Sequence, residues 1–294
     1  PRQAFDVCLV RAYENGRPAR VEAHLRCNGR GVDAGGLVFS AGYPGTTRRN
    51  LTYQDLEYER ACRISPLRDW AAGLDAVLRE FSARGEESAR LAWPARFAVE
   101  NTRKRYDGEW ESLADPELLR ARKAGEEALR ARIAATPQLA AVAGAWEEIE
   151  EADKRLAEDC PEGDWLGRFA DKSSFLLFAA RTLVRHAVEE EKDDGRRLRP
   201  FRESNRSVLE QGLFAEKEVG DELESAVLEW WLTRTVENAG GDRGLEEVLL
   251  AGRSPHDRAR ELVFSTKIKT AGERRRLYGL DRVALEDVAK GDPL

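Results

Sequence analysis

The sequence predicts a mainly α-helical protein with a small β segment at its N-terminus. Before about Leu51, apolar residues alternate loosely with polar ones between glycine-rich turns, which is typical of short strands. From Thr52 onward the apolar period changes to 3.6, which is typical of amphipathic helices. A Gly-Tyr-Pro-Gly turn at residues 42–45 ends the last apolar run before this change. We therefore expect two domains, residues 1–51 and residues 52–294.

Composition excludes some partner classes. The chain has 294 residues and can bury a sizeable core. Charged residues make up 35% of it, with 48 basic and 54 acidic side chains interleaved and a net charge of −6, so no nucleic-acid-binding surface is indicated. No apolar run approaches the ~18 residues needed to cross a membrane, so neither nucleic acid nor membrane is an expected partner.

The β segment is predicted to hold strands at residues 4–13, 21–25 and 37–41, with an Asn15-Gly16 turn after the first. These strands are too few to close a barrel or a sandwich. The missing strands must therefore come from a longer parent chain or from a partner. Uncovered strand edges favour self-pairing, so a homodimer is an expected assembly.

Apolar stripes and capping residues predict the helices of residues 52–294. Ser65-Pro66 is predicted to begin a helix whose apolar stripe runs from Leu67 to Phe81, and Asp115-Pro116 to begin another that ends near Thr136. A charged, mobile connector is expected at residues 192–200. The remaining helices are predicted at residues 53–63, 86–105, 138–158, 164–191, 216–238, 245–250, 255–264 and 273–290.

Cysteine and histidine spacing does not indicate a metal site. The four cysteines have no C-x-x-C spacing, and two readings stay open: disulfides in an exported protein, or buried free thiols. The three histidines have no partner at metal-ligand spacing, so we expect each to be structural or exposed. These residues are Cys8, Cys27, Cys62, Cys160, His24, His186 and His256.

Catalytic motifs are few. The chain has no phosphate-binding loop, no dinucleotide fingerprint and no serine in a nucleophile-elbow setting. Asp6 is the strongest acidic candidate because it lies between Phe5 and Val7 at the start of an apolar strand. A carboxylate buried there must be hydrogen-bonded or paired, since an unpaired buried charge is very costly.

Three segments resemble the bacterial dipeptidyl-peptidase 7/dipeptidyl-peptidase 11 family of serine exopeptidases, also known through dipeptidyl aminopeptidase BII. The resemblance is more specific over the first 110 residues and loose over the rest. The sequence departs from the family at Val7, where the family has an aromatic residue, and at Gly36, where it has Asp. The segments are FDVCLVRAYENGRPARV, GGLVFSAGYPGTTRRNLT and ENTRKRYDGEW.

The resemblance implies a chymotrypsin-like double β-barrel with an inserted helical domain that covers the active site. Residues 1–51 would be a fragment of the barrel and residues 52–294 most of the helical insert. Asp6 would be the aspartate of a Ser-His-Asp triad whose serine and histidine lie outside this chain, so the fragment alone is expected to be inactive. No cofactor or metal is implied, and the family places the parent protein in the periplasm or outside the cell.

The resemblance also gives a role to Asn101, the asparagine of the ENTRKRYDGEW segment. Family members use this residue to bind the free N-terminus of a peptide substrate. The residues alone indicate an ordinary solvated helix position among Glu100, Arg103 and Lys104. The expected activity is removal of dipeptides from oligopeptides with a free N-terminus. The alternative, from another class, is a non-catalytic helical module for protein interaction.

Overall fold

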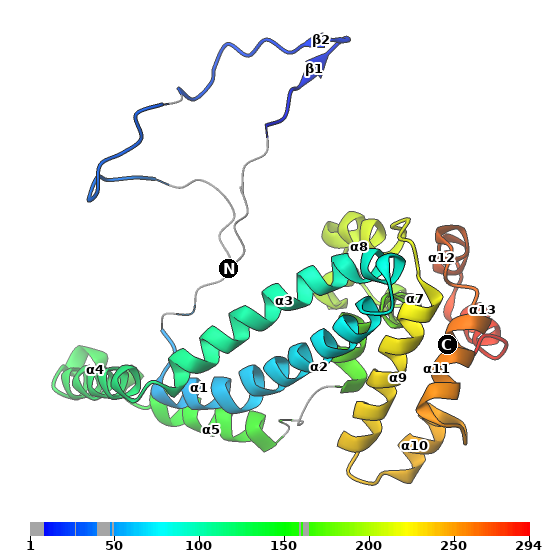
Figure 1. Ribbon diagram of the computed structural model, residues 1–294. Helices are drawn as coiled ribbons and strands as arrows, with labels where there is room; N and C mark the ends of the chain where they lie inside the picture. Colours follow the sequence, from blue (N-terminus) through cyan, green and yellow to red (C-terminus); the bar gives the residue numbers. More distant parts are fainter. Residues whose placement is uncertain (1–8, 27, 40–47, 49, 159, 161–164) are drawn as a thin grey trace. The chain divides into compact units, whose positions relative to one another are not determined.

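The computed structural model describes residues 9–26, 28–39, 48, 50–158, 160 and 165–294 (Figure 1). The chain divides into two units, Pro1–Arg48 and Arg49–Leu294. The described residues are mostly helical, which confirms the predicted class. They contain none of the expected double β-barrel.

The first unit contains one small antiparallel hairpin. Strand β1 (Tyr13–Glu14) pairs with β2 (Arg17–Pro18), with Tyr13 opposite Pro18 and Glu14 opposite Arg17. Between them Asn15 and Gly16 both have positive φ angles, of 52° and 74°, as a two-residue hairpin turn requires. The predicted Asn-Gly turn is therefore confirmed.

The longer strands predicted around this turn are not present in the described residues. Residues 9–12, 21–25 and 37–39 form no strand, and Asp6, Cys8, Cys27 and the 42–45 turn lie outside the described residues. Leu9, Leu25 and Phe39 are 95%, 97% and 89% exposed. The predictions were wrong here because a strand needs a partner for its backbone groups, and no described segment supplies one.

The second unit begins with a capped helix, α1 (Tyr53–Tyr58). The Asp55 backbone N–H donates to Thr52 Oγ1 at 3.0 Å, and the Thr52 N–H donates to Asp55 Oδ2 at 2.7 Å, forming a capping box. The helix continues through a π-helical turn, Glu59–Ile64, into α2 (Ser65–Ser82).

The predicted N-cap role of Ser65 is therefore wrong, although α2 does begin at this residue. Ser65 has helical angles, φ −56° and ψ −53°, and caps nothing. The π turn ends at Ile64, two residues before Pro66, whose missing N–H a regular helix would have to accommodate. The predicted apolar stripe is largely confirmed, because its members apart from half-buried Val77 are buried.

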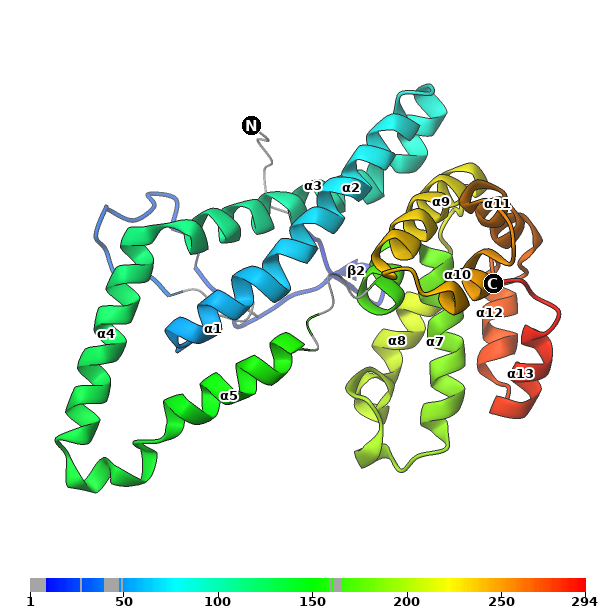
Figure 2. The ribbon, with the colours of Figure 1, turned by 90° about the horizontal axis from the view of Figure 1, so that it is seen from below.

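Helix α3 (Glu86–Ala114) runs beside α2 (Figures 1 and 2) and extends nine residues beyond its predicted end at residue 105. Buried Tyr106 begins this extension, and Trp110 and Leu113 within it pack against the core. Helix α4 (Pro116–Ala134) starts as predicted, with Asp115 Oδ1 accepting the Glu117 N–H at 2.8 Å.

The next predicted helix, residues 138–158, was wrong in its first part. Residues Pro137–Val142 form a 3₁₀ helix, and α5 covers only Ala145–Glu158. Leu139, Val142 and Leu156, which a continuous amphipathic helix would turn towards the core, are 39%, 47% and 51% exposed. Helix α5 lies beside α1, at one end of the unit (Figure 2).

The C-terminal half holds the remaining helices. The predicted helix at residues 164–191 is interrupted at Ser174, whose hydroxyl caps α7, and the predicted helix at 273–290 is interrupted at Gly279. The connector expected to be mobile folds into 3₁₀ turns, with Glu189 Oε2 accepting the Leu198 N–H at 2.7 Å. The bounds are Trp165–Phe169 (π), α6 Ala170–Ser173, α7 Phe175–Glu190, 3₁₀ turns Asp194–Arg196, Arg199–Phe201 and Glu203–Asn205, α8 Arg206–Leu213, α9 Asp221–Asn238, α10 Arg243–Leu250, α11 Pro255–Ser265, α12 Ala271–Tyr278 and α13 Arg282–Ala289.

One hydrophobic core joins these helices. Helix α9 contacts α2 on one side and α11 on the other (Figure 2). Trp70 of α2 stacks on Phe169, with ring centroids 5.7 Å apart, and the indole N–H of Trp231 donates to the Trp165 carbonyl at 2.7 Å. No helix among the described residues is long and apolar enough to cross a membrane.

A disulfide joins Cys62, in the π turn before α2, to Cys160, beyond α5. The two Cα atoms are 5.5 Å apart, and the bond closes a loop with a sequence separation of 98. Of the two alternatives left open by the sequence, disulfides or buried free thiols, Cys62 and Cys160 therefore follow the first. Loop closure removes freedom from the unfolded chain, so a long loop gives a large stabilisation.

Removing this disulfide should destabilise the helical unit. We expect Cys62→Ser to lower the free energy of unfolding by about 3–5 kcal/mol, since the chain-entropy relation gives roughly 4.7 kcal/mol for a loop of about 100 residues. Urea unfolding of the 294-residue chain checks this. The unsubstituted chain in reductant should match the variant, and an unchanged midpoint in Cys62→Ser would contradict the assignment.

Acid should destabilise the fold through His186. This residue of α7 is 5% exposed, and its ring stacks on Tyr278 with centroids 3.7 Å apart. Among the described residues its Nδ1 has no hydrogen-bond partner, with Glu190 Oε1 3.9 Å away, and burial lowers the His186 pKa from 6.5. A depressed folded-state pKa gives a stabilisation that is present above the unfolded pKa of about 6.5 and is lost as pH falls through the folded value.

The variant His186→Phe keeps a ring on Tyr278 and removes the titration. We expect urea-unfolding stability between about pH 7 and pH 5 to fall less steeply in this variant than in the unsubstituted chain. Exposed His256 provides the matched control. His256→Phe leaves the buried His186 ring in place, so stability should fall with pH as steeply as in the unsubstituted chain. Equal slopes for His186→Phe and the unsubstituted chain would refute the assignment.

Candidate functional site

Of the two candidate site residues, Asp6 and Asn101, only Asn101 lies among the described residues. Asp6 lies outside the described residues, so its position stays untested. Asn101 lies on α3, seven residues after Pro94, which is inside that helix. The site is therefore built from α3 and from what fixes its orientation.

A buried carboxylate fixes how α2 and α3 face each other. The Asp75 side chain, on α2, is 1% exposed. It accepts from Arg79 Nε of the same helix at 3.0 Å and from Arg103 Nη1 of α3 at 2.6 Å. Losing Arg103 would leave this buried charge with Arg79 of its own helix, and breaking a buried ion pair costs up to about 3–5 kcal/mol. The Asp75–Arg103 pair therefore sets the register of the two helices.

Other ion pairs extend this contact along the helices. Arg79 Nη2 lies 2.6 Å from Glu100 Oε1, and Arg68 Nε of α2 lies 2.7 Å from Asp107 Oδ1 of α3. These pairs are partly exposed, so each contributes little by itself. Their consequence is that Glu100 and Arg103, the charged neighbours of Asn101, are held against α2.

Asn101 itself points away from this contact. The buried positions of α3 are Ala92, Val99 and Tyr106, and a 100° rotation per residue puts Asn101 on the other side of the helix. Its side chain is exposed and has no hydrogen-bond partner within the described residues. Its amide oxygen and its two N–H donors are therefore available to a ligand.

The same side of α3 carries an aromatic pair that the sequence analysis missed. Trp93 and Phe97 pack edge to face, with ring centroids 4.9 Å apart and an interplanar angle of 61°. They precede Asn101 by eight and four residues, and so lie on one helical stripe with it. The signal is present in the sequence as W-x-x-x-F-x-x-x-N, a spacing that places the three residues on one side of a helix.

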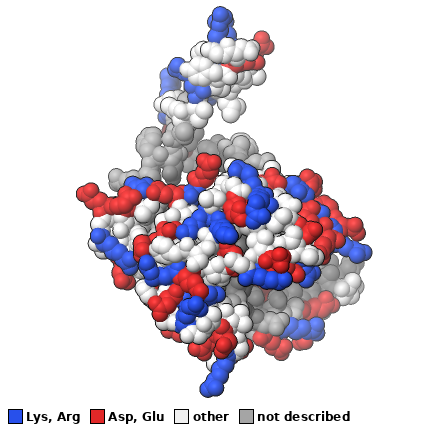
Figure 3. Space-filling model, turned by 90° about the vertical axis from the view of Figure 1, so that its right-hand side faces the viewer, with Lys and Arg blue, Asp and Glu red and all other residues white. Residues whose placement is uncertain are grey.

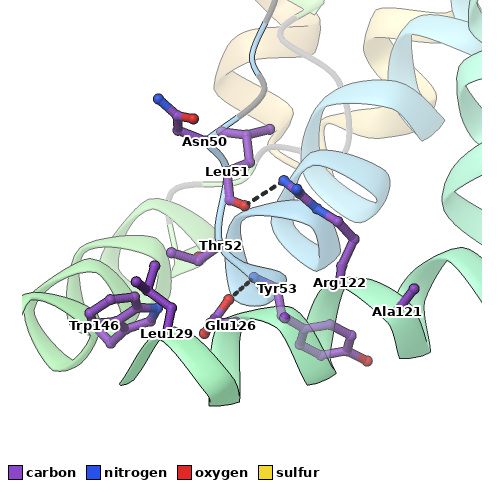
Figure 4. A pocket seen from close by; sticks show the side chains of 10 residues that line it. Asn50, Leu51, Thr52, Tyr53, Ala121, Arg122, Glu126, Leu129 and Trp146 are labelled. Atoms are coloured by element: carbon purple, nitrogen blue, oxygen red, sulfur yellow. Dashed lines mark hydrogen bonds between the residues drawn. The ribbon is translucent and has the colours of Figure 1, made fainter. Parts of the chain in front are cut away.

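A cavity of about 440 Å³ lies where the chain enters the helical unit (Figure 4). Arg122 Nη2 donates to the Leu51 carbonyl at 3.0 Å, and the Tyr53 N–H donates to Glu126 Oε2 at 2.7 Å. Trp146 and Leu129 line the other side of the cavity. Two polar side chains of α4 that line the cavity, Arg122 and Glu126, thus bind the backbone of the entering chain and anchor residues 50–53 on this helix.

A second cavity, of about 270 Å³, lies between α2, α3 and α9. Its polar groups are used within the fold: Trp70 Nε1 donates to Ser173 Oγ at 2.9 Å, and Ser174 Oγ donates to Glu224 Oε2 at 2.5 Å. Burial raises the pKa of Glu224, which also accepts the Phe175 N–H at 3.3 Å. This carboxylate therefore caps α7 from a neighbouring helix.

Metal binding has no support in the described part of the chain, where no group of three or more His, Cys, Asp or Glu side chains could hold an ion. His256 Nδ1 lies 2.9 Å from Glu229 Oε2, which leaves this histidine paired at the surface. On the face shown in Figure 3, acidic and basic side chains are interspersed.

The comparisons with known proteins bear on the helical unit and the β segment together. A model of the family described as peptidase S46 matches residues 1–294. An Asp/Glu-specific dipeptidyl-peptidase from Shewanella putrefaciens is 27% identical over 233 residues, covering 72% of this chain and 30% of the relative. The chain thus spans about a third of the length of that relative. Because the family match extends over every residue of the chain, this protein belongs to the peptidase S46 family.

Proposed function

We propose that this chain is the central part of a serine dipeptidyl-peptidase that removes dipeptides from the free N-terminus of oligopeptides. Membership of the peptidase S46 family and similarity to an Asp/Glu-specific dipeptidyl-peptidase support this function. The 30% coverage of that relative supports a longer parent protein. Residues 1–51 would belong to a chymotrypsin-like barrel and residues 52–294 to a helical insert over the active site.

The observation that carries the proposal is the free amide of Asn101 on an exposed face of α3. A substrate's α-ammonium group offers three donors and no acceptor, so it needs acceptor oxygens. The amide oxygen of Asn101 accepts one of these hydrogen bonds without the desolvation cost of a second charge. Because Glu100 and Arg103 are engaged with α2, neither competes for this amide.

Asp6 takes the role of the triad aspartate in this proposal. It accepts a hydrogen bond from the histidine Nδ1–H, which holds the imidazole in the tautomer that can remove the serine proton. The serine and histidine would come from parts of the parent protein outside this chain. The isolated chain should therefore show no peptidase activity, since a triad acts as a unit.

The proposed location is the periplasm or the extracellular space. The disulfide between Cys62 and Cys160 supports it, because disulfides form and persist in oxidising compartments.

The role of Asn101 is tested in the full-length protein. We expect Asn101→Ala to lower kcat/KM for dipeptidyl substrates with a free amine by about 10- to 150-fold, the equivalent of roughly 1.5–3 kcal/mol for a hydrogen bond to a charged group. Lys104→Ala, at an exposed position three residues further along α3, is the matched control and should keep normal kcat/KM. An unchanged kcat/KM in Asn101→Ala would leave this residue as an ordinary surface side chain.

The role of Asp6 is tested by Asp6→Asn, also in the full-length protein. The amide cannot hold the productive imidazole tautomer, so kcat should fall by about 10⁴-fold while circular dichroism and thermal unfolding stay unchanged. Asp33→Asn replaces an exposed carboxylate in the same unit and should leave kcat intact. Near-normal turnover in Asp6→Asn would remove Asp6 from the catalytic site.

A further inference from the structure

The segment that contains α4 and α5 is not held by the hydrophobic core. We call residues 116–158, all of which the structure describes, the strap. None of its apolar side chains is buried, and none is among the half-buried side chains that pack against the core. Segments with few buried apolar contacts are the ones that open locally most easily. Without another constraint, the strap should therefore be far less stable than the core helices α2, α7 and α9.

The one buried side chain of the strap, Asp153 on α5, weakens the contact of this helix with α1. It is 6% exposed, and its Oδ2 has no hydrogen-bond partner among the described residues. Burial and then the charges of Asp55 on α1 and Glu59 in the π turn raise the Asp153 pKa. A buried carboxylate near other carboxylates disfavours the folded arrangement. The packing of α5 on α1 is therefore a poor source of stability for the strap.

A covalent bond compensates for this weak packing. Cys160, two residues beyond the end of α5, is bonded to Cys62, in the π turn that follows α1. The disulfide therefore attaches the C-terminal end of the strap to the segment that follows α1, the helix on which α5 packs. At its other end, α3 leads into the strap through the Asp115 cap.

Between its two ends the strap binds the residues that enter the helical unit (Figure 4). Arg122 Nη2 donates to the Leu51 carbonyl at 3.0 Å, and Glu126 Oε2 accepts the Tyr53 N–H at 2.7 Å. Tyr53 is the first residue of α1, so its N–H has no acceptor within its own helix. The protection of this amide from solvent exchange therefore depends on the strap.

We propose that the Cys62–Cys160 disulfide is a redox-sensitive attachment of the strap. When the bond is reduced, α4 and α5 detach and lose their hydrogen bonds to residues 51 and 53, while the core stays folded. The redox state of one bond thus decides how firmly the entering chain is held. This device belongs to the helical unit itself and does not depend on the proposed peptidase function.

The reductant for this step is a dithiol. One of its thiolates attacks a sulfur of the disulfide, which forms a mixed disulfide and releases the other cysteine as a thiolate. The second thiol of the reductant then displaces the remaining cysteine. Two electrons pass to Cys62 and Cys160, which take up the two protons that the dithiol loses, and the reductant becomes a disulfide. Both cysteines are half-buried, so neither lies in the sealed core.

The test is hydrogen–deuterium exchange of the full-length protein, oxidised or treated with dithiothreitol, with mass spectrometry of its peptides. We expect reduction to speed exchange at least tenfold in peptides from residues 116–158, and to remove the protection of the Tyr53 amide. Peptides from α2, α7 and α9 should still be protected when the strap has exchanged fully. Reduction also lowers the global stability, but these helices exchange only when the core itself opens.

Variants attribute the effect to this bond and to this contact. The double variant Cys62→Ser/Cys160→Ser should exchange like the reduced protein, and dithiothreitol should cause no further change in its strap. Glu126→Ala removes the acceptor of the Tyr53 N–H, so this amide should lose its protection even in the oxidised protein. Glu127→Ala, at the exposed neighbouring position of α4, is the matched control and should leave the Tyr53 amide protected.

Two results would overturn the proposal. One is equal exchange of the strap in the oxidised and the reduced protein, which would show that the disulfide does not hold it. The other is loss of protection in the core peptides at the same rate as in the strap, because reduction would then unfold the whole helical unit. Circular dichroism of the reduced protein checks the second point independently, since most of the helical signal should remain.

Discussion

The pairing of Asp75 with Arg103 is the interaction on which the candidate site depends. Asp75 is 1% exposed and joins α2 to α3 through a guanidinium group 2.6 Å away. A buried carboxylate tolerates few alternatives, because another register would remove its Arg103 partner and leave it with Arg79 of its own helix. With α2 and α3 fixed in this way, one side of α3 faces the core and the opposite side is exposed. The identity of the residues on that exposed side, Asn101 among them, follows from this one constraint.

Local signals in the sequence predicted the elements that depend on local chemistry. The Asn15-Gly16 turn, the Asp115 cap and the apolar stripe of α2 each depend on residues within a few positions of one another. The start of the first helix also has a local cause, the capping box formed by Thr52 and Asp55. Boundaries failed where tertiary contacts decide them, as at Ser174, whose hydroxyl is engaged by Glu224 of another helix.

The candidate site could be predicted only in part for the same reason. Asn101 could be singled out from a resemblance, but its free amide depends on Glu100 and Arg103 being engaged with α2, which spacing along α3 does not reveal. The Cys62–Cys160 pairing is equally non-local, and the sequence left two readings open. Trp93 was visible in the sequence, but its exposure depends on which side of α3 faces the core. The strands expected before residue 51 depend on partners that no described segment provides.

The disulfide has a topological consequence for α3, α4 and α5. Cys62 precedes these helices and Cys160 follows α5, so the sulfur–sulfur bond encloses the whole segment, Asn101 included, in a covalent ring. A single backbone cut anywhere inside the ring opens it without separating the two pieces of chain. In a compartment that contains proteases, the helical unit therefore stays linked after one such cut. Only a second cut or a reductant would release a fragment.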